Sequence, residues 1–275
     1  MRKSYRVTFP NHRGEELVGI LDTNERPRFF ALFSHCFTCS KDLKAIVRIS
    51  RVLAEGGVGV LRYDYTGLGD SHGDFQTTNF TTTCLDTICA AQFLAREYEP
   101  PQLLVGHSLG GTASYQIAEQ LEPVRAIVTI ASPSCTTHLS DFLAASNPEI
   151  DASGFGWVTI GNRPVPITAQ LMQDLRSHDV PSRIKSLTKP LLLFHSPDDE
   201  TLNYRHSTNA LYWAPGRSSL ITLPGSDHLL TNQAEDIPLV GQTILAWANR
   251  FCGTPLGGAQ PGSLSSSSES RSCPN

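Results

Sequence analysis

The run Gly106-His107-Ser108-Leu109-Gly110-Gly111 has the clearest chemical potential in the chain. It follows a short apolar stretch, Leu103–Val105, and precedes a helical pattern, which is the context that a nucleophilic serine on a sharp strand-to-helix turn requires. Such a turn brings its two ends close together, so only small residues fit two positions before and after the serine, here Gly106 and Gly110. The pattern predicts an exposed Ser108 hydroxyl at a helix N-terminus, whose N–H groups favour a developing negative charge.

A serine hydroxyl is a weak nucleophile unless a base removes its proton, and that base is typically a histidine oriented by a carboxylate. The chain has nine histidines, and His228 lies between the last predicted strand and the last predicted helix, at the rim where sites in open α/β sheets occur. His195 ends a strand, where we expect it to pack or hydrogen-bond locally. His107 adjoins the serine, and we expect its side chain to diverge from the apex. We therefore predict His228 as the base.

The orienting acid is expected on the loop Ser196–Thr201, which contains three adjacent acids, Asp198, Asp199 and Glu200. All three cannot be catalytic, and the position in the loop favours Asp199, with Asp198 as the alternative. The resulting chain order is nucleophile, acid, base.

Two backbone amides are expected to stabilise the oxyanion, each worth about 2.7–4 kcal/mol of barrier. One is the amide of Leu109, directly after the nucleophile, and the other is the amide of Phe37, on the loop after the first central strand. That loop also contains Cys36 and Cys39, a C-x-x-C pair. No second C-x-x-C exists to complete a zinc site and no thioredoxin pattern surrounds the pair, so we expect neither a metal nor a redox role. The alternative is a sensor in which oxidation distorts the loop.

Strand-like and helix-like patterns alternate over most of the chain, which predicts an α/β fold with a mainly parallel sheet and helices on both faces. An opening hairpin is expected to add antiparallel edge strands. The predicted strands are 5–9, 17–21, 29–33, 58–63, 103–105, 124–130, 190–195 and 219–223, and the predicted helices are 42–55, 81–98, 109–121, 203–213 and 235–250. The loop Asp64–Ser71 is interpreted as a tight glycine turn braced by its end residues, with a binding loop as the alternative.

Residues 133–189 interrupt the alternation and are expected to form a lid or cap, with helices around Asp141–Ala145 and Thr168–His178. Apolar positions here either line an acyl pocket or form the core of the cap itself. These positions are Gly154–Trp157, Ile167, Leu171, Met172 and Leu175, and Arg163, Arg176 and Arg183 accompany them.

Composition narrows the partners and the compartment. The 22 Lys and Arg against 26 Asp and Glu give a net charge of −4, which argues against nucleic-acid binding. No run of 18 apolar residues exists to span a membrane, and no signal-peptide pattern follows Met1. We therefore interpret the seven cysteines as reduced thiols and predict a cytoplasmic protein. Neither a metal nor a cofactor is predicted, and the oligomeric state is left open.

Five segments in order give the chain a family resemblance. They are His35-Cys36-Phe37-Thr38, Asp64–Ser71, Gly106–Gly111, His195–Asp199 and Gly225–His228. Together they resemble an α/β-hydrolase of the esterase and acylglycerol-lipase-like or serine-aminopeptidase-like group, over about residues 15–250. The resemblance implies Phe37 as an oxyanion donor and Asp199 as the acid, and the chain departs from the usual pattern at Cys36, where glycine is common. The run from His35 also resembles bacterial hydrolase domains that are sometimes fused to an OsmC-like domain.

The sequence thus predicts an α/β-hydrolase domain over residues 1–252, with the cap insertion at about 133–189, and a disordered polar tail or linker over 253–275. The leading hypothesis is a serine hydrolase that cleaves small-molecule carboxylic esters of small to medium acyl chains through an acyl-enzyme. The alternatives are an aminopeptidase or amidase that uses the same triad, and a non-catalytic scaffold.

Overall fold

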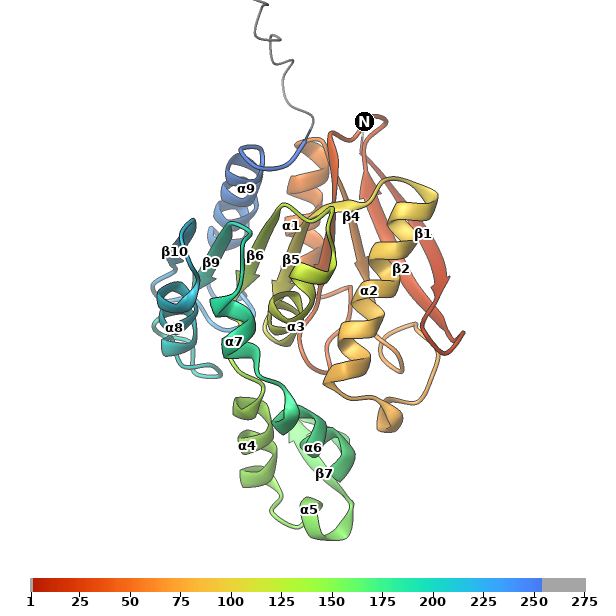
Figure 1. Ribbon diagram of the computed structural model, residues 1–275, viewed down its shortest axis with the longest axis vertical. Helices are drawn as coiled ribbons and strands as arrows, with labels where there is room; N and C mark the ends of the chain where they lie inside the picture. Colours follow the sequence, from red (N-terminus) through yellow and green to blue (C-terminus); the bar gives the residue numbers. More distant parts are fainter. Residues whose placement is uncertain (1, 254–275) are drawn as a thin grey trace, which may run out of the picture.

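An eight-stranded sheet forms the centre of the computed structural model, which describes residues 2–253 (Figure 1). The strand order is β1-β2-β4-β3-β5-β6-β9-β10. The β1–β2 and β2–β4 pairs are antiparallel and the other pairs in this sheet are parallel, so the predicted sheet and its antiparallel edge hairpin are confirmed. The strands are β1 (Lys3–Pro10), β2 (Glu16–Thr23), β3 (Phe29–Ser34), β4 (Val58–Tyr63), β5 (Pro101–His107), β6 (Ala126–Ile130), β9 (Leu191–His195) and β10 (Ser218–Thr222). Of the predicted tail, residues 254–275 lie outside the described residues.

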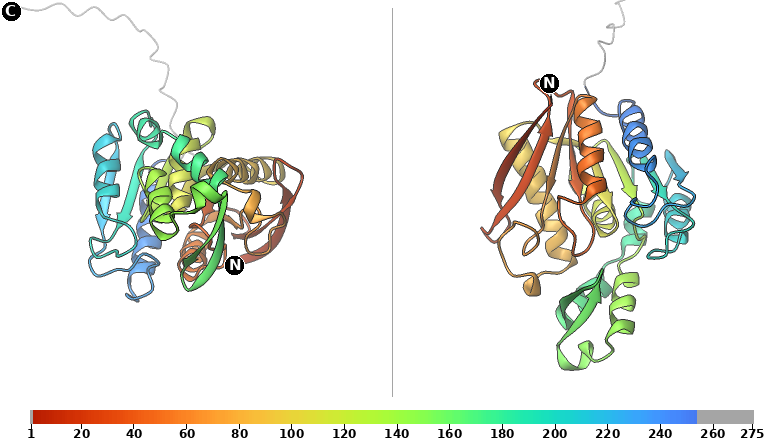
Figure 2. Two further views of the ribbon diagram at one scale, coloured as in Figure 1. Left: turned by 90° about the horizontal axis from the view of Figure 1, so that it is seen from below. Right: turned by 180° about the vertical axis from the view of Figure 1, so that it is seen from behind.

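Helices cover both faces of the sheet, as the continuous apolar runs of the central strands require. Every residue of β3 is buried, and alternate side chains enter two different hydrophobic clusters. Phe29 and Phe33 pack in the cluster that includes α1 (Lys44–Glu55) and α9 (Asp236–Ala248). Leu32 packs in the cluster that includes α2 (Phe80–Glu97) and α3 (Leu109–Ile117). The two views of Figure 2 show α1 and α9 on the face opposite to α2 and α3.

The predicted helix boundaries agree with the structure to within a few residues. Helix α1 ends at the Gly56-Gly57 pair, where Gly57 takes a φ of 89° that favours glycine. Helix α2 begins at Asn79, whose side chain accepts a hydrogen bond from the Thr82 amide in a capping box. Helix α3 is followed by the short 3₁₀ helix η2 (Ala118–Gln120), and α8 (Arg205–Trp213) precedes β10.

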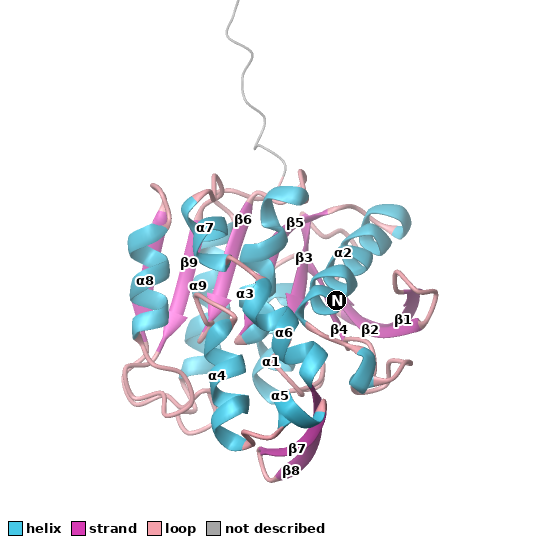
Figure 3. Ribbon diagram, turned by 60° about the horizontal axis from the view of Figure 1, so that its bottom comes forward, coloured by secondary structure: helices cyan, strands magenta, loops and turns pink. Residues whose placement is uncertain are grey.

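The segment between β6 and β9, here called the inserted segment, lies at the carboxyl end of the parallel strands (Figures 1 and 3). It contains α4 (Thr137–Ser146), α5 (Ile150–Ser153), β7 (Phe155–Ile160), β8 (Arg163–Thr168), α6 (Ala169–Ser177) and α7 (Val180–Lys185). The two predicted helices are confirmed as α4 and α6. The β7–β8 hairpin was not predicted from the sequence, although its turn at Gly161 and Asn162, with φ of 54° and 64°, is a recognisable two-residue hairpin signal.

The Asp64–Ser71 loop after β4 is a tight turn, as predicted, and a buried charge cluster attaches it to the loop after β3. The Asp64 side chain is fully buried and accepts hydrogen bonds from the Lys41 amide (2.7 Å), Lys41 Nζ (2.8 Å) and the Asp70 amide (2.9 Å). The Ser71 hydroxyl donates to the Asp64 carbonyl at 2.7 Å. Since the Lys41 ammonium also contacts Asp42 and Asp70, the chain after β3 is held firmly against the chain after β4.

Candidate active site

Ser108 stands at the apex of the turn from β5 into α3, in a backbone conformation that side chains seldom adopt. Its φ is 52° and its ψ is −123°. A methyl group on Gly106 would lie 2.3 Å from the Gly111 amide nitrogen, and one on Gly110 would lie 2.4 Å from the Ser34 carbonyl oxygen. The predicted steric requirement for glycine at both positions is therefore met, and the strain is confined to the residue that presents the hydroxyl.

His228 and Asp199 meet beside this turn. The Nδ1 atom of His228 lies 2.7 Å from Oδ2 of Asp199, whose side chain is 1% exposed. Burial by itself raises the pKa of Asp199, but hydrogen bonds from His195 and His228 outweigh it and hold the pKa well below its ordinary value. The ionised carboxylate fixes the His228 tautomer with the proton on Nδ1, so Nε2 is left with a lone pair that can accept a proton.

Asp198 takes a different position from Asp199. Its carboxylate accepts a hydrogen bond from the Gly225 amide at 2.7 Å, which joins the two loops that carry Asp199 and His228. Asp199 also accepts from the amides of Thr201 and Leu202, at 2.8 and 2.9 Å. The structure therefore brings Asp199, rather than its sequence alternative, to the histidine.

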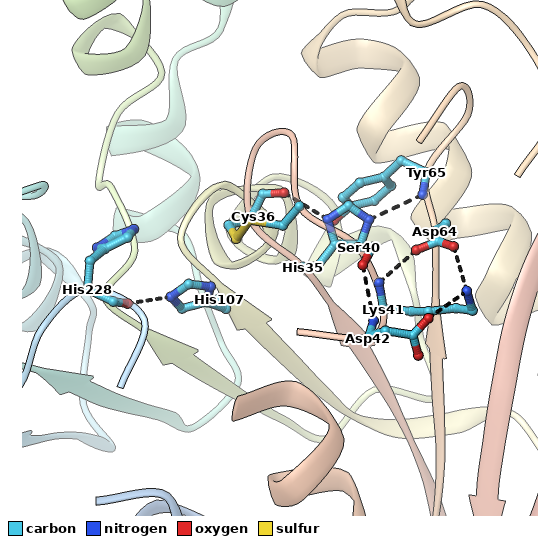
Figure 4. Close-up of a disulfide and its surroundings, with 10 residues drawn as sticks. His35, Cys36, Ser40, Lys41, Asp42, Asp64, Tyr65, His107 and His228 are labelled. Atoms are coloured by element: carbon cyan, nitrogen blue, oxygen red, sulfur yellow. Dashed lines mark hydrogen bonds and ion pairs between the residues drawn. A yellow bond between two sulfur atoms is a disulfide. The ribbon is translucent and has the colours of Figure 1, made fainter. Parts of the chain in front are cut away.

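His107, whose side chain we expected to diverge from the apex at Ser108, contacts the loop of His228. Its Nε2 atom donates to the His228 carbonyl at 2.8 Å, and the two rings lie 5.1 Å apart (Figure 4). Burial lowers the pKa of His107 to about 3, so the ring is neutral at neutral pH. Within residues 2–253 no hydrogen bond joins the Ser108 hydroxyl directly to His228, and this contact from the neighbouring residue is what sets the His228 loop beside the serine.

His195 hydrogen-bonds locally, as the sequence predicted, and one of its partners is Asp199. Its Nε2 atom lies 3.2 Å from the same Asp199 oxygen that contacts His228, and its Nδ1 atom lies 2.9 Å from the Ser207 hydroxyl. Asp199 therefore lies between two imidazoles. The spacing of four residues between a strand-end histidine and the acid is the signal that relates them.

The loop after β3 corrects one sequence interpretation. Cys36 and Cys39 form a disulfide with a Cα–Cα distance of 5.3 Å, within the range of such bonds, so they are not the reduced thiols that we expected. A separation of three residues lets the two cysteines meet locally. Cys84, Cys89, Cys135 and Cys252 are free among the described cysteines.

The same loop presents the Phe37 amide. The residue with positive φ in this loop is Thr38, at 59°, whereas Cys36, where the resemblance led us to expect glycine, is not among the residues with positive φ. Among residues 2–253, no hydrogen bond occupies the amide of Phe37 or that of Leu109, the first residue of α3. Both N–H groups are therefore unused next to the turn around Ser108, residues 106–110, which is called the elbow below.

A small pocket of about 20 Å³ is lined in part by Phe37 and Leu109. Its lining joins the Phe37 loop, Leu109, the start of α2 and Leu171 from α6 of the inserted segment. Of the apolar positions singled out in the sequence, Leu171 reaches the pocket, whereas Ile167, Met172 and Leu175 are buried in a hydrophobic cluster. Phe155 and Trp157 are instead exposed on the hairpin, at 38% and 57%.

Searches of the described part of the chain found neither a metal-type cluster nor a membrane span. Residues 2–253 contain no group of three or more His, Cys, Asp or Glu side chains arranged to hold a metal ion. Over the same residues, no helix combines the length and apolar character needed to cross a bilayer.

Comparison with known proteins identifies the fold family. The model of the alpha/beta hydrolase family matches residues 31–237. The crystal structure of the esterase domain of a Rhodothermus marinus protein is 38% identical, covers 91% of this chain and 100% of that domain, and superposes with a TM-score of 0.75. Est1E of Butyrivibrio proteoclasticus with bound ferulic acid shares the fold at 21% identity and a TM-score of 0.71, over 89% of this chain and 98% of its own.

Two curated relatives match over part of the chain. Human protein ABHD12B is 31% identical over 57% of this chain, and the lysophosphatidylserine lipase ABHD12 of Xenopus tropicalis is 29% identical over 62%. The matches span only 41% and 43% of these two proteins. The family match and the Rhodothermus domain extend over most of the described fold, and with it over the elbow and the two loops beside it. The chain therefore belongs to the alpha/beta hydrolase family.

Proposed function

We propose that the protein is a serine hydrolase that cleaves carboxylic esters of small to medium acyl chains through an acyl-enzyme. The observation that carries the proposal is the Asp199–His228 pair at 2.7 Å, attached through His107 to the loop of a strained Ser108. A nucleophile, a base and an acid with these relations have the roles of a catalytic triad. The 38% identity to an esterase domain supports ester chemistry.

The reaction follows from these positions. His228 Nε2 removes the Ser108 proton as the hydroxyl oxygen attacks the ester carbonyl, and Asp199 stabilises the imidazolium that forms. The free amides of Phe37 and Leu109 donate to the oxyanion of the tetrahedral intermediate. The imidazolium then protonates the leaving alcohol, and a water molecule activated by the same histidine releases the acid from Ser108.

The pocket beside the two proposed oxyanion donors supports an apolar acyl group. It adjoins both amides, and aromatic and aliphatic side chains such as Phe75, Phe80 and Leu171 line it. We propose that the inserted segment acts as a cap, because α6 contributes one wall. These apolar side chains suit contact with the hydrocarbon part of an acyl group.

A fluorophosphonate probe and a panel of p-nitrophenyl esters test the proposal. We expect the wild-type protein to be labelled and to hydrolyse the acetate and butyrate esters, and Ser108→Ala to lose both properties while it stays folded by circular dichroism. Ser146→Ala, an exposed serine on α4, serves as the matched control and should behave as the wild type. Full turnover by Ser108→Ala would remove the assignment, and aminoacyl-anilide turnover far above ester turnover would replace it with an amidase.

A further inference from the structure

The disulfide encloses the residue to which the proposed function assigns one oxyanion donor. Cys36 and Cys39 close a four-residue turn, and the Cys39 amide donates to the Cys36 carbonyl at 3.3 Å. Inside the turn, Thr38 is held at a φ of 59°, which is unfavourable for a β-branched residue. The covalent bond therefore spans the part of the loop with the least favourable backbone.

The direction of the Phe37 amide is fixed through its own peptide bond. In a trans peptide the N–H of Phe37 points opposite to the carbonyl of Cys36, so whatever holds the carbonyl aims the amide. That carbonyl accepts two hydrogen bonds, from the Cys39 amide and from His35 Nδ1 at 2.7 Å (Figure 4). The amide of Phe37 is itself unoccupied and free to meet an oxyanion.

His35 can serve this purpose because it is neutral and fully buried. Its Nε2 atom accepts from the Tyr65 amide at 3.3 Å while Nδ1 donates to the Cys36 carbonyl, an assignment that follows from the two partners. Burial lowers the pKa of His35 to about 4, in keeping with that neutral form. The N-terminal end of the turn is thus held by His35, and its C-terminal side is held by the Lys41–Asp64 pair.

Between these two fixed ends, the disulfide is the covalent constraint on Phe37 and Thr38. Without it, His35 would still hold the Cys36 carbonyl, but the closure of the turn across Phe37 and Thr38 would depend on the 3.3 Å hydrogen bond from the Cys39 amide, while Thr38 favours a return to negative φ. Such a return turns the peptide that follows Phe37 and loosens the one that precedes it. An oxyanion donor stabilises the transition state only when it already points at the position of the oxyanion. A misdirected Phe37 amide therefore lowers kcat.

We propose that the Cys36–Cys39 disulfide is a redox-sensitive clamp on the Phe37 amide, so that dithiol reduction slows ester hydrolysis and reoxidation restores it. The inference rests on the proposed serine hydrolase function. A dithiol such as dithiothreitol attacks the sulfur of Cys39, the less buried partner, and forms a mixed disulfide. Its second thiol then displaces the protein sulfur, so two electrons and two protons pass to Cys36 and Cys39 and the reagent becomes its cyclic disulfide.

The test compares oxidised wild type, dithiothreitol-reduced wild type, Cys36→Ser/Cys39→Ser and the matched control Cys89→Ser, a half-buried free cysteine on α2. The kcat and KM values for p-nitrophenyl butyrate are measured together with inhibition by a trifluoromethyl ketone, which forms a tetrahedral oxyanion on the serine. We expect kcat to fall tenfold or more on reduction and in the double variant, with a parallel loss of ketone affinity and KM within twofold. Complete loss of one donor, about 10²–10³-fold, is the upper limit. Cys89→Ser should respond to dithiothreitol as the wild type does.

Three results would contradict the proposal that the disulfide holds the Phe37 amide. One is equal kcat in the oxidised and reduced wild type, with thiol titration showing that the disulfide has opened. Another is an equal effect of dithiothreitol on the double variant, which has no such bond. The third is a change in KM alone, which would indicate a role in binding rather than in the transition state. Failure of the proposed function is distinguishable, because the oxidised wild type would then show neither ester turnover nor fluorophosphonate labelling.

Discussion

Gly110 offers a direct test of how the elbow and the oxyanion loop fit together. It lies in the first turn of α3, and a methyl group there would stand 2.4 Å from the Ser34 carbonyl oxygen and 2.6 Å from that of His35. Ordinary contact begins near 3.4 Å, so Gly110→Ala must separate α3 from the backbone that leads to Phe37 by about 1 Å. Both partners are backbone atoms, so no side-chain rotation can relieve the contact.

The expected effect is mainly kinetic. A displacement of about 1 Å at a catalytic group costs about 10²-fold in rate, or about 2.7 kcal/mol of barrier. Stability should change less, because overpacking costs about 1–3 kcal/mol while alanine in a helix returns up to about 1 kcal/mol relative to glycine. We expect kcat for p-nitrophenyl butyrate to fall about 10²-fold in Gly110→Ala, with a cooperative thermal transition retained.

Gly241→Ala is the matched control. It also places a methyl group on a helical glycine in close contact, 3.0 Å from Val52 Cβ, but at the α1–α9 packing and away from the loops of the site. Its kcat should stay within twofold of the wild type. If Gly110→Ala folds and keeps kcat within threefold, contact between the elbow and the loop does not set the oxyanion geometry, and the reasoning is refuted.

Three further outcomes are expected. Asp199→Asn should lower kcat about 10³–10⁴-fold and Asp198→Asn less than tenfold in the same ester assay, and the reverse order would exchange the two acids. Burial raises the pKa of Asp86 from 3.8 to about 6, so its contribution to folding stability is fully present below about pH 4 and falls by about 3 kcal/mol as the pH rises through 6. Urea unfolding at pH 4 and pH 7 should therefore show a larger loss of unfolding free energy for the wild type than for Asp86→Asn. An equal change in the two proteins would contradict this prediction. Lys41→Met should lower the free energy of unfolding by about 3–5 kcal/mol, because the buried Asp64 carboxylate loses its charged partner. Arg6→Ala breaks an exposed pair and should cost under about 1 kcal/mol, and equal losses would mean that burial does not matter here.

Much of the fold could be predicted from the sequence, because the central strands and the helices that cover them carry strong periodic patterns. β3 is a continuous apolar run and α1 ends at paired glycines, and each signal is local. The β7–β8 hairpin was missed because Pro164 and Pro166 fall within β8, where they weaken the strand signal, and because one face of the hairpin is exposed.

The site was harder to predict where its geometry depends on long-range contacts. The pairing of Asp199 with His228 joins two loops that only the sheet brings together, and position in the loop was enough to favour Asp199. The contact of His107 with the His228 carbonyl depends on ring orientation, which sequence spacing does not specify. The disulfide was not predicted, because cysteines of a cytoplasmic protein are expected to be reduced. The separation of three residues was the local signal that the two could pair.

The place at which the inserted segment leaves the sheet has a consequence for how related chains diversify. Helix α7 completes the return from the end of β6 to the start of β9, so the part from 131 to 179 is an excursion beyond the strand ends. That part can lengthen, shorten or be exchanged while the hydrogen-bonded ladder between β6 and β9 stays unchanged. Under the proposed function, preference for one ester over another can therefore change by insertion and deletion while Ser108, Asp199 and His228 keep their places.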